Sequence, residues 1–202
     1  EIRQELVEMG EPYIDAGIEV LVSMLLRIEY LDLWQDIRFE LIEYGTPVVS
    51  FVADLLRAKF ETVGEKVVIP QTRELMNLFL VLVSFLNDSK KEVAEFISHR
   101  SYHARQLLAS AMGELRDPFY VYDLKILASD ESWQVRMAAY RALGEIVGRK
   151  AEVKQILFSS FAREKETVCI NEILLSISKQ GFRSFVPIGM EMVEKTTDPE
   201  KG

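Results

Sequence analysis

The side chains that could bind a metal ion are few in this chain. Its two histidines, His99 and His103, stand four residues apart in the stretch SHRSYH, residues 98–103. Such a pair can bind a metal ion from one face of a helix, but His99 lies at the break before the expected helix. No thiol or carboxylate stands in the same stretch to complete a site. We therefore expect no metal site, with His99 in a turn or at a helix N-cap and His103 at the surface.

The remaining catalytic candidates are also weak. Cys169 is the single cysteine, so the chain cannot form an internal disulfide. We expect a small core residue there, a reducing compartment and a cytoplasmic location. There is no glycine-rich phosphate loop, nucleophile elbow or Cys-x-x-Cys pair. No carboxylate stands in an apolar setting that would raise its pKa for acid–base chemistry. The sequence therefore predicts no catalytic residue, no cofactor and no enzyme activity.

The charge is acidic and unevenly distributed. The chain of 202 residues has a net charge of −8 and a pI near 5.0, which argues against a general nucleic-acid binder. Residues 1–65 hold 14 acidic and 5 basic side chains, which form either a solvated face or a docking surface for a basic partner. Residues 90–165, with 13 basic and 10 acidic side chains, are the best candidate for nucleic-acid contact.

Apolar residues recur at helical spacing along nearly the whole chain, and strand-like alternation is hard to find. Glycine, proline and capping residues interrupt this pattern at intervals, which predicts about ten or eleven helices of roughly 10–17 residues. The most apolar run, LFLVLVSFL, has nine residues, too few to span a bilayer. We expect it to be a helix buried on most sides, and we expect no membrane insertion by this segment.

The helical pattern repeats. IRQELVEMGEP (2–12) returns as IRFELIEYGTP (37–47), a period of 35, and ARQLLASAMGEL (104–115) returns as VRMAAYRALGEI (135–146), a period of 31. Looser copies lie at 72–86 and 167–181, and residues 58–70 read as a long connection. Two helices per period of this length predict an all-α superhelix, or solenoid, of about five to six helical hairpins. We expect one domain over residues 1–194, a disordered tail over 195–202, and, because the chain begins at Glu1, a fragment or processed product.

The unit around residues 130–146 resembles the second helix of a HEAT repeat, and the segments with Gly-x-Pro resemble the short HEAT-like repeat of phycobilin lyases. The resemblance implies an armadillo-like array that binds proteins, with small residues such as Ala138 and Ala142 at helix contacts. It also implies a polar ladder between repeats, formed by Asp130 with Arg136 and by Asp32 with Arg38.

The second helices of such arrays usually line the concave side, and that side binds extended partners. On the helix from Val135 to Ile146 the spacing predicts Val135, Ala138, Ala139, Ala142 and Leu143 as the buried face. Exposed Met137 and Tyr140 beside Arg141 have the character of an interface hot spot. The predicted partner-binding face comprises Met137, Tyr140, Arg141 and Glu145, with Gln106, Ala109, Ser110, Glu114, Phe39 and Glu43 from earlier copies.

The function predicted from the sequence is a non-catalytic scaffold that binds a protein partner along this second-helix face. Three alternatives stay open: a chromophore- or ligand-handling protein of the lyase type, a weak nucleic-acid binder through residues 90–165, and a structural module of a larger protein. In the third case LVSMLL (21–26) and VPIGMEMV (186–193) are candidate contacts. The partner, process and oligomeric state are not predicted.

Overall fold

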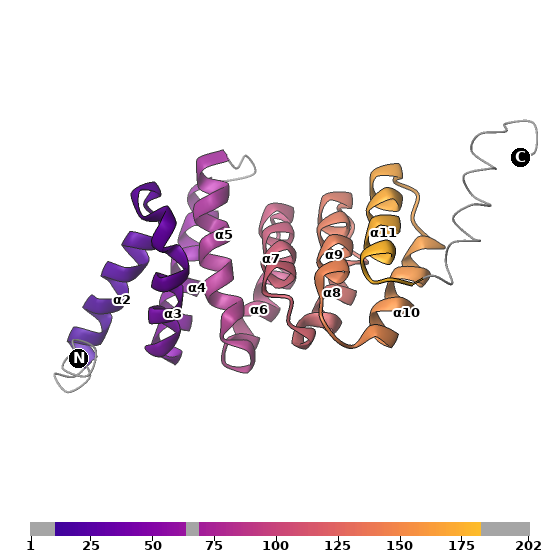
Figure 1. The fold of residues 1–202 in the computed structure, drawn as a ribbon. Coiled ribbons are helices and arrows are strands. Elements are labelled where there is room, and N and C mark those ends of the chain that lie inside the picture. Colours follow the sequence, from indigo (N-terminus) through magenta and orange to yellow (C-terminus); the bar gives the residue numbers. More distant parts are fainter. Residues whose placement is uncertain (1–10, 64–68, 183–202) are drawn as a thin grey trace, which may run out of the picture. The chain divides into compact units, whose positions relative to one another are not determined.

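The computed structural model describes residues 11–63 and 69–182 of the chain. These residues contain ten α-helices, three short 3-10 helices and no strand (Figure 1). The chain divides into two compact units, Glu1–Ala111 and Met112–Gly202, with the boundary inside helix α7 (Tyr102–Leu115). The prediction of an all-α helical-repeat fold of the solenoid class is confirmed.

The first unit is built from pairs of antiparallel helices. Helix α2 contacts α3 and α4, and α5 contacts the same two helices. The elements before α7 are α2 (Glu11–Leu25), η1 (Ile28–Leu33), α3 (Trp34–Glu43), α4 (Thr46–Val63), α5 (Ile69–Ser84), η2 (Leu86–Ser89) and α6 (Lys90–Ile97).

Helix α5 provides much of the core of the first unit. All side chains of its apolar run from Leu78 to Val83 are at most 3% exposed, as the sequence predicts. Three rings meet beside it: Phe79 lies 6.1 Å from Phe60 and 5.2 Å from Phe96, between ring centroids. An aromatic cluster within a mainly aliphatic core therefore joins α4, α5 and α6.

The helix ends follow the predicted breaks, with one correction. Gly45, Gly148 and Gly181 take positive φ angles of 76°, 102° and 71°, which glycine adopts without the strain that a side chain would cause. The predicted long connection over 58–70 is wrong, because α4 continues to Val63 and α5 begins at Ile69. Thr62 and Val63 do not interrupt a helix that already has a packed face in Val52, Leu56 and Phe60.

The second unit consists of two helix pairs after α7. Helix α9 contacts α8 and α11, α10 contacts all three, and α9 and α11 lie side by side (Figure 1). The elements are η3 (Pro118–Tyr120), α8 (Val121–Leu127), α9 (Trp133–Glu145), α10 (Lys150–Phe161) and α11 (Thr167–Lys179).

Two glycines allow the second helices of this unit to approach closely. Gly113 of α7 and Gly144 of α9 occupy the same place in the repeated sequence. A Cβ atom on Gly113 would lie 2.7 Å from Ala142 Cα, and one on Gly144 would lie 2.7 Å from Ser176 Oγ. Both distances are too short for real atoms, so glycine is required for the observed spacing.

Several predictions fall outside the described residues. These are the first repeat copy up to residue 10, the VPIGMEMV segment and the disordered tail over 195–202. The single domain over residues 1–194 stays a prediction.

Replacing Gly144 with alanine should destabilise the second unit. The new Cβ would displace the Ser176 hydroxyl from the carbonyl of Tyr140, to which it donates over 2.8 Å. We expect the free energy of unfolding to fall by about 1–3 kcal/mol, although alanine has the higher helix propensity. Urea unfolding followed by circular dichroism measures this difference.

Gly17→Ala is the matched control. A Cβ on Gly17 would lie 2.8 Å from the hydroxyl oxygen of Tyr44, which is the end of a side chain that can move aside. We expect that variant to be as stable as the natural chain or more so. A Gly144→Ala variant with unchanged stability would contradict the close approach of α9 and α11.

Candidate functional site

The predicted face of α9 is only partly exposed. Val135, Ala138, Ala139, Ala142 and Leu143 are buried, as the spacing predicts. On the other side Arg141 is exposed, whereas Met137 and Glu145 are half-buried.

The prediction that Tyr140 is exposed is wrong. This residue is only 2% exposed, and its hydroxyl lies 3.1 Å from the carbonyl oxygen of Ala128 and 3.0 Å from Glu164 Oε2. The sequence pattern assigned one buried face to α9, but a helix inside an array has neighbours on several sides. The contact with α11 and with the loop before it buries Tyr140 and Gly144 as well.

The residues predicted from earlier copies lie mainly in the first unit. Gln106 and Ser110 of α7 are half-buried, and the Ser110 hydroxyl donates to the carbonyl of Gln106 in its own helix over 3.0 Å. Ala109 is fully buried, so its place on the predicted face is wrong. Phe39 and Glu43 of α3 are exposed, and so is Glu114, which belongs to the second unit. The full predicted set is therefore divided between two units, each with its own geometry.

The repeated arginines bind the loops that precede their own helices. Arg136 Nη1 donates to the carbonyl oxygens of Asp130 and Glu131, both over 3.0 Å. One period earlier, Arg105 Nη1 donates to the carbonyl oxygens of His99 and Arg100 over 2.7 and 3.3 Å. These carbonyls follow the C-terminal ends of α8 and α6, where a positive charge is favourable.

Besides its bond to the Asp130 carbonyl, Arg136 has a second partner that the sequence did not predict. Its Nε and Nη2 atoms donate to the carboxylate of Glu164 over 2.8 and 2.9 Å, which joins α9 to the loop between α10 and α11. Arg38 lies over the rings of Trp34 and Phe39, with its guanidinium carbon 5.1 and 5.7 Å from the ring centroids. The pairing of Arg38 with Asp32 stays a prediction.

The Glu164 carboxylate is nearly buried and accepts several hydrogen bonds. The side chain is 3% exposed, and it accepts from Arg136, from the Tyr140 hydroxyl and from the backbone N–H groups of Lys165 and Glu166. The hydrogen bonds from Arg136 are the main reason that the pKa of Glu164 is lowered to about 2. Burial, and then the charge of Glu164, raise the pKa of Tyr140.

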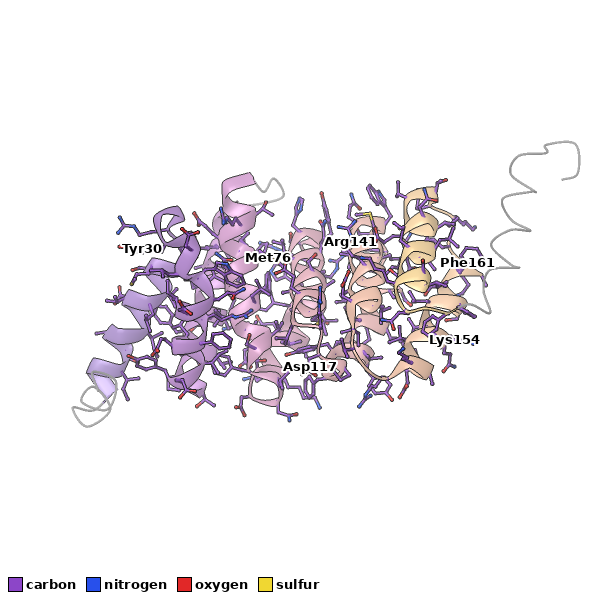
Figure 2. All side chains as sticks on the ribbon, viewed as in Figure 1. Tyr30, Met76, Asp117, Arg141, Lys154 and Phe161 are labelled. Carbon is purple, nitrogen blue, oxygen red and sulfur yellow. The ribbon has the colours of Figure 1, made fainter. Side chains whose placement is uncertain are left out.

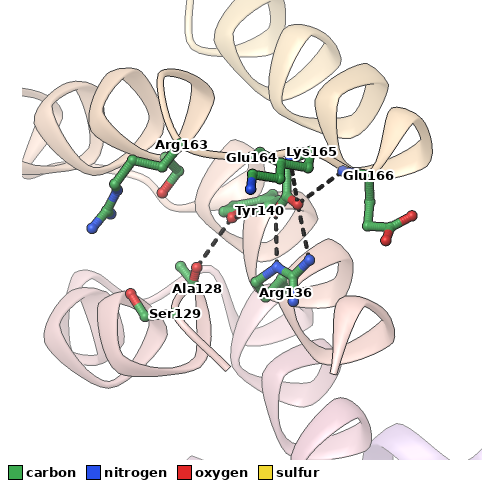
Figure 3. Close-up of a pocket in the computed structure, with 9 residues that line it drawn as sticks. Ala128, Ser129, Arg136, Tyr140, Arg163, Glu164, Lys165 and Glu166 are labelled. Atoms are coloured by element: carbon green, nitrogen blue, oxygen red, sulfur yellow. Dashed lines mark hydrogen bonds and ion pairs between the residues drawn. The ribbon is translucent and has the colours of Figure 1, made fainter. Parts of the chain in front are cut away.

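A pocket of about 380 Å³ opens beside this carboxylate, between the loops after α8 and α10 (Figure 3). Its floor includes Tyr140, Arg136 and Glu164, which bind one another, and its rim includes Arg163 and Lys165. An ionised carboxylate whose two oxygens already accept five hydrogen bonds has no proton to donate near neutral pH. The floor of the pocket is thus a structural network that ties together α9 and two loops.

Polar side chains of α11 and of its C-cap residue, Gln180, satisfy backbone carbonyls of α9 along the contact between the two helices. Besides the Ser176 bond, the Gln180 side-chain amide donates to the carbonyl oxygens of Leu143, Gly144 and Ile146 over 3.0, 3.1 and 2.9 Å. These oxygens lie at the C-terminal end of α9, where helix carbonyls lack partners in their own helix. Sequence reasoning did not identify Glu164, Ser176 or Gln180, because such polar residues show no periodic signal of burial.

Arg141 lies at the exposed edge of the contact between α9 and α11. Its Nη2 and Nε atoms donate to the two carboxylate oxygens of Glu172 over 2.9 and 3.3 Å. The Glu172 side chain is only 9% exposed, whereas that of Arg141 is 58% exposed. The bonds to Glu172 raise the pKa of Arg141, so the guanidinium remains charged.

Val168, Glu172 and Leu175 stand four and three residues apart on α11, which puts them on one face of that helix. Val168 is 47% and Leu175 57% exposed. Because Glu172 binds Arg141, this face continues onto α9. We call these three residues and Arg141 the α9–α11 face. Arg141 is labelled in Figure 2.

The histidines and the cysteine take ordinary structural places. The His99 ring lies in the turn before α7, where Nδ1 accepts from the N–H of Ser101 over 3.1 Å, and desolvation lowers its pKa. Half-buried His103 stacks beside Tyr102, and burial raises the pKa of Cys169 to about 11. No group of three His, Cys, Asp or Glu side chains suited to a metal ion occurs within residues 11–63 and 69–182.

The comparison with family models matches residues 81–178 to HEAT repeats. This part of the chain, just under half of its length, is therefore similar to HEAT repeats. Comparisons with curated proteins and with solved structures give no match. HEAT repeats generally serve as protein-interaction scaffolds and are typically non-catalytic. In the described part of the chain no helix combines the length and the apolar character that crossing a membrane requires.

The Glu164 network predicts a specific loss of stability in acid. A carboxyl group whose folded pKa is lowered stabilises the fold above its unfolded pKa, and this stabilisation is lost as the pH falls through the folded pKa. We expect Glu164 to contribute about 3 kcal/mol that disappears between about pH 5 and pH 2. Glu164→Gln should therefore lower the free energy of unfolding at pH 7 by about 2–4 kcal/mol and flatten its pH dependence.

Urea unfolding at a series of pH values checks this expectation. Glu166→Gln, an exposed substitution in the same loop, is the control and should leave both quantities almost unchanged. Equal curves for the two variants would show that the network around Glu164 does not stabilise the fold.

Proposed function

We propose that the chain is a non-catalytic protein-interaction module whose partner docks on the α9–α11 face. HEAT repeats supply rigid arrays of helices with exposed side chains at fixed spacing, which suits binding to extended segments. The observation that supports this face is Arg141, an exposed guanidinium held in place by a nearly buried carboxylate.

The pair with Glu172 orders Arg141 before any partner arrives. A free arginine loses side-chain entropy when it binds, and a pre-ordered one loses less. Glu172 occupies two of the N–H groups of the guanidinium, and its exposed part can donate to a partner carboxylate or carbonyl. Ordered arginines of this kind are frequent among the residues that dominate binding energy.

Apolar side chains on the same face supply contact area. Val168 and Leu175 are each about half exposed and stand on the α11 face that carries Glu172. An ordered cation beside exposed aliphatic side chains suits a partner segment that combines an acidic or carbonyl group with apolar residues. The proposed α9–α11 face therefore differs from the face predicted from the sequence. It includes residues of α11, and it omits Tyr140, which is buried. The assignment of this face to the concave side stays a prediction.

Leu175→Asp should weaken partner binding by at least about tenfold, because it puts a charge in an apolar contact. The partner is first identified by a photo-crosslinking amino acid at position 175 in extract from the native source. Its affinity for the purified chain is then measured by calorimetry. Val20→Asp is the matched control, because Val20 is exposed to the same degree, 56% against 57%, and lies in α2.

Arg141→Lys provides a second test. Lysine keeps the charge opposite Glu172 but lacks the planar fork, so folding should persist while binding weakens. Unchanged affinity in both the Leu175 and Arg141 variants, or crosslinks that are equally abundant at positions 20 and 175, would exclude the α9–α11 face as the docking site.

A further inference from the structure

A second exposed apolar cluster lies on α8 and on the turn before α10. Tyr122 and Ile126 stand four residues apart on α8 and are 56% and 58% exposed. Val147, in the turn, is 68% exposed, and its N–H donates to the carbonyl of Arg116 over 3.1 Å. Single exposed apolar residues are common, but two on α8 and a third in the turn that leads into α10 need an explanation.

Arg149 connects the two parts of this cluster. Its guanidinium carbon lies 5.0 Å from the centroid of the Tyr122 ring, so the N-cap residue of α10 covers an aromatic side chain of α8. Helices α8 and α10 are in contact. We call Tyr122, Lys125, Ile126, Val147, Arg149 and Lys150 the α8–α10 face.

The charges on this face are positive. Lys125, Arg149 and Lys150 are exposed, and within the described part of the chain none of the three forms an ion pair. The nearest acidic residues on the same two helices, Asp123 and Glu152, are half-buried. A little further along α10, Lys154 lies over the ring of Phe158 at 5.3 Å, as Arg149 lies over Tyr122.

The two residues at the start of α10, Arg149 and Lys150, do not stabilise that helix. Arg149 has φ 43° and ψ 39°, a left-handed conformation that costs energy for a residue with a side chain, and it makes no side-chain cap bond. Arg149 and Lys150 also place positive charge at the end of the helix that is already positive. Gly45 and Gly181 take positive φ angles as glycines, whereas Leu86 and Arg116 share with Arg149 a positive φ at a residue that has a side chain. Local conflicts of this kind are expected where a residue is kept for binding.

We infer that the α8–α10 face binds an acidic peptide segment that also carries apolar side chains. The three cations attract its carboxylates, and Ile126 and Val147 with the edge of Tyr122 provide an apolar contact between them. A nucleic acid fits this surface less well. Its phosphates would leave Ile126 and Val147 without partners, and the Tyr122 ring is already covered by Arg149 rather than free to stack on a base.

The experiment uses the full chain and a short fluorescent peptide that alternates Glu or Asp with Leu or Phe. A peptide with Lys in place of every acid and a single-stranded oligothymidine are compared with it. We expect the acidic peptide to bind. The double variant Arg149→Glu/Lys150→Glu should lower the affinity for this peptide by at least about tenfold. The matched control is Lys90→Glu/Lys91→Glu, which reverses two exposed cations at the start of α6 in the same way and should have little effect.

Two further variants separate binding from folding. Arg149→Gly removes the strained conformation, so its melting temperature should equal or exceed that of the natural chain while peptide affinity falls. Ile126→Ser should lower the affinity for the peptide, whereas Leu175→Ser on the α9–α11 face should leave it unchanged. Three results would each overturn the inference: no binding of the acidic peptide, equal losses in the two charge-reversal variants, or tighter binding of the oligothymidine than of the peptide. Peptide binding that is lost in Leu175→Ser but kept in Ile126→Ser would place the peptide on the α9–α11 face and would also overturn the inference.

Discussion

The close approach of α9 and α11 is the constraint on which the second unit depends. It requires glycine at position 144, because any side chain there would meet Ser176. At this distance the polar side chains of α11 can reach the backbone of α9, and Ser176 and Gln180 satisfy carbonyl oxygens that water can no longer reach. The same approach covers Tyr140 and leaves Arg141 at the edge of the contact, where Glu172 holds it. One steric requirement therefore determines both the interior of the unit and the exposed cation of the proposed binding face.

Two nearly buried carboxylates, one in the loop before α11 and one in α11 itself, are each paired with an arginine of α9. Glu164 and Glu172 are nearly inaccessible carboxylates, and each accepts two hydrogen bonds from an arginine of α9. A buried charge without a partner is strongly unfavourable, so each pair is a condition for this packing rather than a surplus contribution to stability. The two arginines differ in exposure: Arg136 is enclosed and structural, and Arg141 remains available to solvent. On the α8–α10 face, by contrast, Arg149 and Lys150 form no ion pair within the described residues, and their charges are unfavourable at the start of α10.

Much of the architecture could be predicted from the sequence. The breaks at Gly45, Gly148 and Gly181 and the buried stripe from Val135 to Leu143 follow from local rules, because glycine conformation and helical periodicity act within a few residues. The candidate site was predicted less well. Arg141 was identified as exposed, but Tyr140 was assigned to the wrong side and the partner of Arg136 was missed, since Glu164 lies 28 residues further along the chain.

The sequence by itself determined the fold class, the helical repeat and the residues that face the partner helix of the same hairpin. These features depend on periods of three to four residues within a helix and of about 31–35 residues between repeats, both of which are visible in one dimension. Only the tertiary structure decided which polar residues are interior and which cations are free to bind. That choice depends on how near one repeat lies to the next, and this distance is set by contacts such as Gly144 with Ser176 that no local pattern records.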